Sequence, residues 1–254
     1  MTAVDVTQSK GGTGAASSVP VWDVPTRLFH WALVLSIVGS WASYEFSDWL
    51  RDPTLKIHRY FGYAAVILIV WRLLWGVFGP RAARFAVFVR GPVSVATYTW
   101  DLIRLRERPY ASHNPLGAYA VLALLGFVLV QSSLGLVAVE HNWTTWGPLS
   151  HLIKDGALQS RLTKLHGQFF YWGLLILVGI HVAAALYHSI FRGEPLVRAM
   201  VTGRKPAHRY ADADAVIGSQ WSTGTTIGAA LGWLAVSMAL FGGVIVTLGG
   251  KIFY

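Results

Sequence analysis

Five apolar segments of about 20 residues each constrain this chain more than any other feature. A helix of that length crosses about 30 Å of hydrocarbon and pairs its own backbone polar groups, as lipid requires. Charged residues make up 13% of the sequence and apolar residues 54%, whereas soluble domains carry about 25% charged residues. The sequence therefore predicts an all-α integral membrane helical bundle, with spans near residues 26–46, 57–78, 116–139, 165–191 and 227–248.

The basic residues predict how the chain is oriented. Of the 21 Lys and Arg residues, 13 fall on the side of the N-terminus, seven fall on the opposite side, and Arg72 lies inside the second span. Because cytoplasmic loops are enriched in Lys and Arg, we expect a multi-pass protein of the bacterial inner membrane with a cytoplasmic N-terminus. The net charge of +9 then reflects topology, and no basic module for nucleic acid is visible.

Four histidines lie inside the spans or at their ends, where ionisable residues are costly and usually functional. His58 and His166 open the second and fourth spans at the outer level. His30 lies near the inner end of the first span, and His181 lies 15 residues beyond His166, about 22 Å deeper. Two histidines at one depth can ligate a haem iron from both faces. The sequence predicts two such pairs, His58 with His166 and His30 with His181.

The spacing within the fourth span leaves alternatives open. Fifteen residues put His166 and His181 about 60° apart around the helix, and fourteen would put them about 40° apart in the opposite sense. Helix tilt or a local bulge would accommodate either value. His188 competes with His181 as a ligand, but it lies about 10 Å closer to the inner surface. The lack of cysteine excludes thiolate clusters and covalently attached haem.

Three arginines are candidate cofactor contacts. Arg72 lies 14 residues after His58, at the inner haem level, where it could pair with haem propionates or a quinone headgroup. Arg27 and Arg59 could serve propionates as well. The alternative for each arginine is a side chain that snorkels to the interface.

Two glycines and one histidine complete the predicted cofactor contacts. Gly62 and Gly167 lie next to histidines, where they would give a macrocycle room or let helices pack closely. His113 precedes the third span, near the expected position of a propionate. It is followed by Asn114 and Pro115, which predict a helix start. The remaining histidines are assigned to loops or to the inner interface: His141, His151, His188 and His208.

Several stretches of the chain together resemble the bacterial cytochrome b561 family, which includes the cytochrome b subunits of nickel–iron hydrogenases. They are VWDVPTRLFHW, KIHRYFGY, RLLWGVFGPRAARFAVFVRGP, SHNPLGAYAVLALLGFVLVQSSLG and GIHVAAALYHSIFRGEPLVRAMVTGRK. The resemblance covers roughly residues 20–206. It implies a four-helix core with two b haems and the same two histidine pairs. The 15-residue gap in the fourth span is one residue longer than the resemblance leads us to expect.

Composition and the extent of the resemblance divide the chain into four expected parts. We expect residues 1–20, which are rich in Gly, Ser and Thr, to form a disordered cytoplasmic tail, and residues 21–206 to form the four-helix dihaem membrane domain. Residues 207–222 are a linker to an additional transmembrane helix within 223–254. Within the domain, residues 79–112 mix arginines with apolar residues, as interfacial segments do. The outer loop 140–163 is long enough to dock a periplasmic partner.

These features predict a dihaem b-type cytochrome that transfers electrons between the quinone pool and a periplasmic redox protein. The expected cofactors are two haem b, with quinone as an exchangeable substrate and membrane lipid as the surroundings. The periplasmic partner would be a c-type cytochrome or a hydrogenase-like subunit. No pair of catalytic carboxylates or nucleophile is visible, so any enzymatic activity would be quinone oxidoreduction. The alternatives are a membrane anchor or assembly subunit with haems outside the electron path, and a haem-free transporter.

Overall fold

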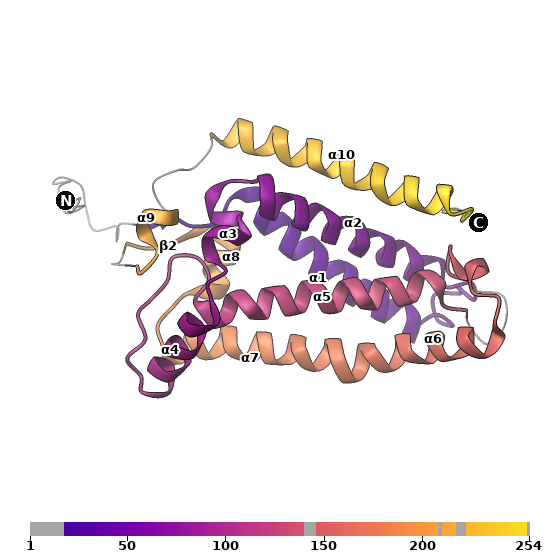
Figure 1. Cartoon of the computed structure of the whole chain (residues 1–254), viewed down its shortest axis with the longest axis horizontal. Coiled ribbons are helices and arrows are strands. Elements are labelled where there is room, and N and C mark those ends of the chain that lie inside the picture. Colours follow the sequence, from indigo (N-terminus) through magenta and orange to yellow (C-terminus); the bar gives the residue numbers. More distant parts are fainter. Residues whose placement is uncertain (1–17, 140–145, 208–209, 217–221, 253–254) are drawn as a thin grey trace.

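A computed structural model of the chain describes residues 18–139, 146–207, 210–216 and 222–252. Long helices dominate it: α1 (Val24–Glu45), α2 (Lys56–Phe78), α5 (Pro115–Val137), α6 (Gly156–Phe169), α7 (Leu175–Phe191) and α10 (Thr223–Thr247). A single π-helical turn, η3 (Phe170–Leu174), joins α6 to α7, so that 156–191 is one continuous helix. The expected all-α bundle is confirmed (Figure 1).

Four of these helices are long and apolar enough to cross a membrane: α2, α5, the continuous helix 156–191 and α10. The first predicted span is also a helix, α1, with 22 residues, but it is not among those four. Arg27, His30 and three serines reduce its apolar character. Two of those serines, Ser36 and Ser43, are buried within the bundle. The structure thus places α1 as a packed member of the core.

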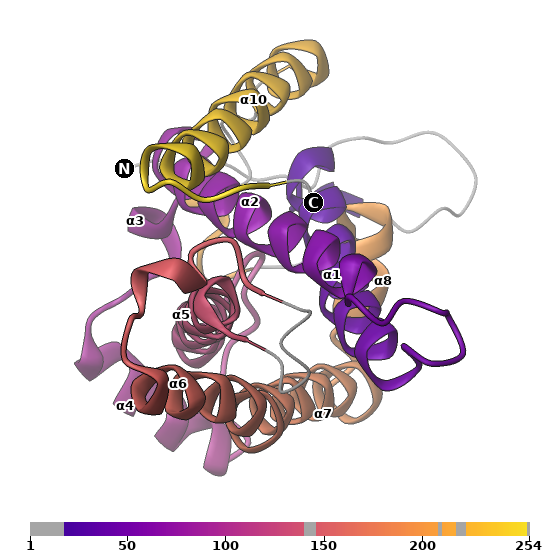
Figure 2. The same cartoon turned by 90° about the vertical axis from the view of Figure 1, so that its right-hand side faces the viewer.

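Helices α1, α2, α5 and α6–α7 surround the centre of the bundle, as the view along its axis shows (Figure 2). Gly39 of α1 lets Phe61 of α2 come close, because a Cβ there would be 2.6 Å from the Phe61 ring. A core cluster between α2, α5 and η3 contains five buried apolar residues: Ala65, Ile69, Leu125, Val128 and Leu174.

The predicted additional helix, α10, lies outside the four-helix core against α2 (Figures 1 and 2). The indole N–H of Trp71 donates to the Ala230 carbonyl oxygen at 3.0 Å. The rings of Phe78 and Trp233 stack with centroids 4.8 Å apart. Aromatic packing and a hydrogen bond therefore hold α10 on the bundle.

Short elements gather at the end of the bundle where α1 begins (Figure 1). Strands β1 (Ser18–Pro20) and β2 (Arg204–Pro206) pair antiparallel there. The last three residues of the predicted tail are thus part of a sheet, and residues 1–17 lie outside the described residues. The other short elements are η1 (Arg81–Ala83), α3 (Phe85–Phe88), α4 (Pro92–Ile103), α8 (Leu196–Thr202) and α9 (Ala213–Val216).

Side-chain caps mark the starts of α5, which the sequence predicts, and of α1, for which the sequence analysis predicts no cap. Asn114 accepts a hydrogen bond from the Gly117 backbone N–H at 2.7 Å, and Pro115 occupies the first turn of α5, which confirms the predicted start. Asp23 accepts from the Thr26 backbone N–H at 2.7 Å at the start of α1. At the opposite end of the bundle, one more short element, η2 (Ser150–Leu152), precedes α6.

Candidate functional site

The two histidines predicted at the outer level face each other across the bundle. His58 lies in the first turn of α2 and His166 lies in α6. Their imidazole centroids are 6.2 Å apart and the ring planes are at 89° to one another. A metal–imidazole bond is about 2 Å long, so two such bonds and the two ring radii together span about 6 Å. The separation suits two histidines that ligate one metal ion from opposite sides.

Backbone carbonyl groups orient both rings. The Nδ1 atom of His58 is 2.8 Å from the Ser40 carbonyl oxygen, and the Nδ1 atom of His166 is 3.0 Å from the Gln131 carbonyl oxygen. A carbonyl oxygen only accepts, so each Nδ1 carries the proton and each Nε2 keeps a lone pair. Metal-ligating histidines are held in this way, by a hydrogen bond from the ring nitrogen that does not bind the metal.

Small residues leave room around the outer pair. A Cβ at Gly135 would be 2.9 Å from the Cε1 atom of His166, so only glycine admits the ring in this position. A Cβ at Gly62 or Gly167 would meet no atom within 4 Å. Packing among the described residues therefore does not require a glycine at either position, in contrast to Gly135.

The two histidines predicted at the inner level, His30 of α1 and His181 of α7, lie within range of an electrostatic interaction. The Nδ1 atom of His30 is buried and has no hydrogen-bond partner among the described residues. A buried polar atom without a partner is costly, so the position of His30 fits a residue that faces a ligand.

A buried arginine lies at the same end of the bundle. Arg72 of α2 is only 3% exposed, and its guanidinium carbon is 4.6 Å from the centre of the Phe85 ring. Its Nη1 atom is buried with no hydrogen-bond partner within the described part of the chain. The carboxylate of Asp23 is close enough to interact with Arg72 electrostatically. Because a buried cation normally pairs with an anion, the Nη1 atom leaves Arg72 able to bind a further negatively charged group.

His113 lies beside Arg72. Its ring is 4.8 Å from that of Trp22 and 4.5 Å from that of Phe88, and it interacts electrostatically with both Arg72 and His181. Burial, followed by the charge of Arg72, lowers the pKa of His113 to about 3. The neutral ring has one N–H to donate, which suits an anionic acceptor next to Arg72.

Arg27 and Arg59 are the other two predicted arginines. Arg27 donates from Nη1 to the Val201 carbonyl oxygen, and Arg59 donates to the Trp146 carbonyl oxygen at 3.4 Å. Arg27 therefore joins α1 to α8, and Arg59 joins α2 to the segment that precedes η2.

Of the remaining four histidines, two lie within the described residues and two do not. His188 is buried and lies 4.0 Å from Glu194, so it belongs to the interior. His151 bonds to the Leu248 carbonyl oxygen at 2.9 Å. His141 and His208 lie outside the described residues.

Sequence reasoning missed several residues that shape these sites. Ser40, Gln131 and Gly135 surround the outer histidines, and Gln131 is a polar residue in an otherwise apolar span, which is a usable signal. Asp212 of the predicted linker is buried and accepts hydrogen bonds from Ala111 and Ser112. Asp212 thus fixes the segment that leads to His113, and no sequence pattern points to that contact.

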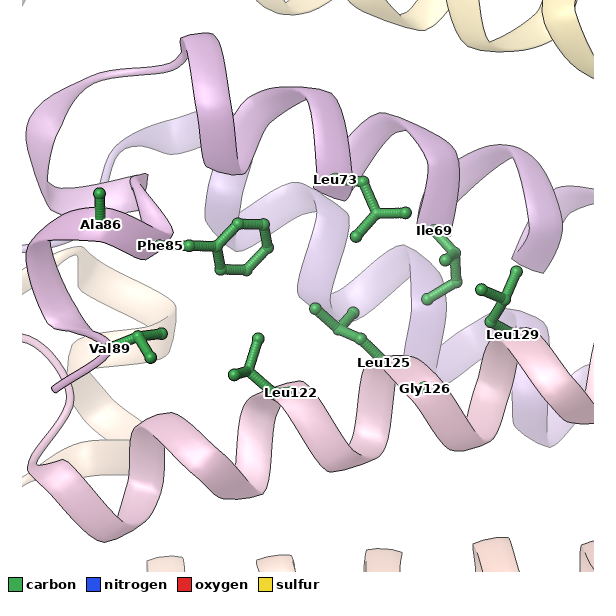
Figure 3. A pocket seen from close by; sticks show the side chains of 9 residues that line it. All are labelled: Ile69, Leu73, Phe85, Ala86, Val89, Leu122, Leu125, Gly126 and Leu129. Atoms are coloured by element: carbon green, nitrogen blue, oxygen red, sulfur yellow. The ribbon is translucent and has the colours of Figure 1, made fainter. Parts of the chain in front are cut away.

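Two apolar pockets open on the surface of the bundle. The first, of about 570 Å³, lies between α2, α3 and α5, and its wall includes Phe85, the residue that covers Arg72 (Figure 3). Its other lining residues are Ile69, Leu73, Ala86, Val89, Leu122, Leu125, Gly126 and Leu129. The second, of about 660 Å³, lies between the end of α1 and the start of α2 and includes Gly39, Ala42 and Phe61.

The candidate metal ligands occur as two pairs of histidines. Among the described residues, no group of three or more His, Asp or Glu side chains could hold a metal ion. Two facing histidines on separate helices suit an iron whose other four ligands come from a porphyrin.

Comparison with known proteins defines the class to which this fold and site belong. The profile of the prokaryotic cytochrome b561 family matches residues 21–203, and the chain therefore belongs to that family. Membership implies a multi-pass membrane protein that uses haem b to transfer electrons.

Named relatives agree with this family. The probable Ni/Fe-hydrogenase B-type cytochrome subunit of Azotobacter vinelandii is 27% identical over 220 residues, which cover 74% of this chain and 88% of the relative. The corresponding protein of Rhizobium leguminosarum bv. viciae is 21% identical, over 74% of this chain and 89% of the relative. No solved structure matches the chain.

Proposed function

We propose that this protein binds two haem b groups and carries electrons between the quinone pool and a periplasmic redox partner. The outer haem would be ligated by His58 and His166, and the inner haem by His30 and His181. The single observation that carries the proposal is the separation of 6.2 Å between the His58 and His166 rings. The unpartnered Nδ1 atom of His30 supports the inner pair.

The protein's contribution is to hold and orient the ligands, while haem iron supplies one-electron chemistry when it is bound. Ser40 and Gln131 fix the tautomer of the outer ligands through their carbonyl groups. Gly62 and Gly167 would give the outer macrocycle room, since a Cβ at either position meets no atom within 4 Å.

The charged residues at the inner end would hold the propionates of the inner haem. Arg72 and His113 offer a buried cation and a neutral donor that lack hydrogen-bond partners on Nη1 and Nδ1 within the described part of the chain. A carboxylate would satisfy both atoms. Arg27 and Arg59 would have supporting roles near the two membrane surfaces.

We propose the first apolar pocket as the place where quinone meets the protein. Its lining is entirely apolar, which suits an isoprenoid tail. Phe85 lies between this pocket and Arg72, the proposed partner of the inner haem propionates. Quinone would then exchange directly from the lipid that surrounds α2 and α5.

The partner and the topology complete the proposal. The relatives named above are hydrogenase cytochrome subunits, so a hydrogenase-like subunit or a c-type cytochrome on the periplasmic side is the expected partner. The distribution of Lys and Arg supports a cytoplasmic N-terminus in the bacterial inner membrane. Residues 21–206 would form the dihaem domain, 207–222 the linker and 223–254 the additional membrane helix.

Reduction by a quinol tests this function. The purified chain in lipid nanodiscs is mixed with a short-chain ubiquinol or menaquinol, and the haem absorption bands are followed after rapid mixing. We expect both haems to be reduced and to be reoxidised by the corresponding quinone. Haems that bind but do not respond to either quinol would indicate an anchoring subunit instead. A chain that binds no haem would favour a transporter.

A further inference from the structure

The π-helical turn between α6 and α7 lies between the two histidines of that helix. The Leu175 backbone N–H donates to the carbonyl oxygen of Phe170, five residues back, instead of four as in an α-helix. The turn begins four residues after His166 and ends seven residues before His181. It therefore changes the rotation of one histidine relative to the other.

We infer that η3 is a register device that absorbs the extra residue between His166 and His181, an inference that rests on the proposed function of these histidines. Helices of a left-handed bundle repeat their inward face about every seven residues, so a spacing of 14 keeps one face inward. In an unbroken α-helix, a spacing of 15 puts the second ring about 60° away from the first around the helix axis, which is one residue, or about 100°, beyond the position that a spacing of 14 gives it. One π turn holds one extra residue and so restores the spacing of two heptads.

The contacts of the two rings agree with this rotation. His166 faces His58 of α2 and bonds to Gln131 of α5. His181 interacts with His30 of α1 and lies near His113, which precedes α5. Both rings thus turn toward the centre enclosed by α1, α2 and α5, although 15 residues separate them.

Packing against α5 holds the π turn in place. Leu174 is 2% exposed and belongs to the core cluster with Leu125 and Val128. A Cβ on Gly173 would be 3.0 Å from the Phe127 ring, so the turn approaches α5 closely at a glycine. On the opposite side, Trp172 is 78% exposed and contributes nothing to the core.

Removal of one residue from the turn tests this role. Deletion of Trp172 gives a spacing of 14 without loss of a buried side chain, and deletion of Ile176, which is 50% exposed, gives the same spacing just beyond the turn. Insertion of one alanine after Trp172 gives a spacing of 16. Trp172→Ala is the matched control, because it removes the same side chain and keeps the spacing. Each variant is purified and measured for haem per chain, low-spin haem EPR signals and haem midpoint potentials.

We expect two haems per chain, with unchanged EPR signals and potentials, in the control and in at least one deletion variant, and one haem in the insertion variant. The register role would be overturned if both deletion variants lost one haem. It would also be overturned if both deletion variants failed to accumulate in the membrane while the insertion variant accumulated there. Fewer than two haems in the unaltered chain would overturn the proposed function and, with it, this inference. Two haems in the unaltered chain with one in both deletion variants would overturn the inference alone.

Discussion

The imidazole rings of His58 and His166 meet at right angles, with their centroids 6.2 Å apart, although the two residues lie on different helices and 108 positions apart in the chain. The Ser40 carbonyl oxygen of α1 holds the His58 ring, and the Gln131 carbonyl oxygen of α5 holds the His166 ring. The outer site therefore depends on all four core helices at once. Substitutions on helices that supply no ligand should still disturb it.

Gly135 on α5 gives the clearest case of such a substitution. In Gly135→Ala, the new Cβ would be 2.9 Å from the Cε1 atom of His166, so the ring must move. We expect the haem content of the purified chain to fall from two toward one, with the inner haem's spectrum unchanged. Gly126→Ala on the same helix is the control, because a Cβ there meets no atom within 4 Å. Equal haem content in both variants would contradict the packing argument.

Arg72 should set the potential of the inner haem. Arg72→Gln removes a buried positive charge, and a nearby cation favours the reduced, more negative state of a redox centre. A unit charge at close range contributes on the order of 1–2 kcal/mol, or roughly 40–90 mV for one electron. We expect the midpoint potential of the inner haem to become more negative by that amount in a redox titration, while the midpoint potential of the outer haem stays the same.

A surface arginine provides the comparison for this charge. Arg104 is exposed and packs over Trp100, so Arg104→Gln changes the net charge by the same amount far from the buried site. We expect no more than a small change in either midpoint potential. A shift as large as that of Arg72→Gln would mean that net charge, and not the buried guanidinium, controls the potential.

Much of the bundle could be predicted from the sequence, because segment length and hydropathy dictate membrane helices and histidine depth dictates which rings can meet. The π turn could not be predicted in the same way. Its position depends on how Leu174 and Gly173 pack against α5, and no residue type marks such a turn. The spacing of 15 residues between His166 and His181 indicated only that some adjustment was needed.

Contacts between segments far apart in the chain could not be predicted from the sequence either. The pairing of β1 with β2 joins residues near position 19 to residues near position 205, and short strands of this kind carry little periodicity. Asp212 was assigned to a linker, yet its carboxylate fixes Ala111 and Ser112. Gly135 is one of many glycines in apolar segments, and only the placed His166 ring distinguishes it from the others.

Filling the first apolar pocket should block quinone exchange without affecting haem binding. Gly126 lines the pocket, and a Cβ there meets no atom within 4 Å, so Gly126→Leu fills space without a backbone clash (Figure 3). We expect haem reduction by quinol to slow at least tenfold while haem content stays the same. Ala42→Leu narrows the second pocket and is the control. If haem reduction by quinol slowed in Ala42→Leu but not in Gly126→Leu, the quinone site would be assigned to the second pocket, at the outer end of the bundle.

Asp52 should stabilise the start of α2, the helix that carries His58 and Arg72. Its carboxylate accepts a hydrogen bond from the Ile57 backbone N–H at 2.8 Å. Burial alone would raise the pKa of Asp52, but hydrogen bonds from the backbone amides of Ile57 and Lys56 hold it below its usual value. Loss of such a cap in Asp52→Ala costs about 0.5–2 kcal/mol, which a lower melting temperature in detergent would report.

The pH dependence of this effect follows from the direction of the shift. Because the folded-state pKa of Asp52 is lowered, its stabilisation is fully present above the ordinary value of about 4 and is lost as the pH falls through the lowered value. The difference in melting temperature between Asp52→Ala and the unaltered chain should be constant from about pH 5 to 8 and shrink below about pH 4. Asp48→Ala, in the same loop, should show neither effect. A difference that grows toward low pH would contradict this account.

The ratio of haem to protein in single-histidine variants tests the central claim most directly. The unaltered chain, His58→Ala and His30→Ala are purified and assayed by pyridine haemochrome with a reduced-minus-oxidised spectrum. The account predicts two non-covalent b haems in the unaltered chain and one in each variant, with different spectra for the haem that remains. Two haems in either variant, or the same remaining haem in both, would contradict the assignment of His58 with His166 and His30 with His181.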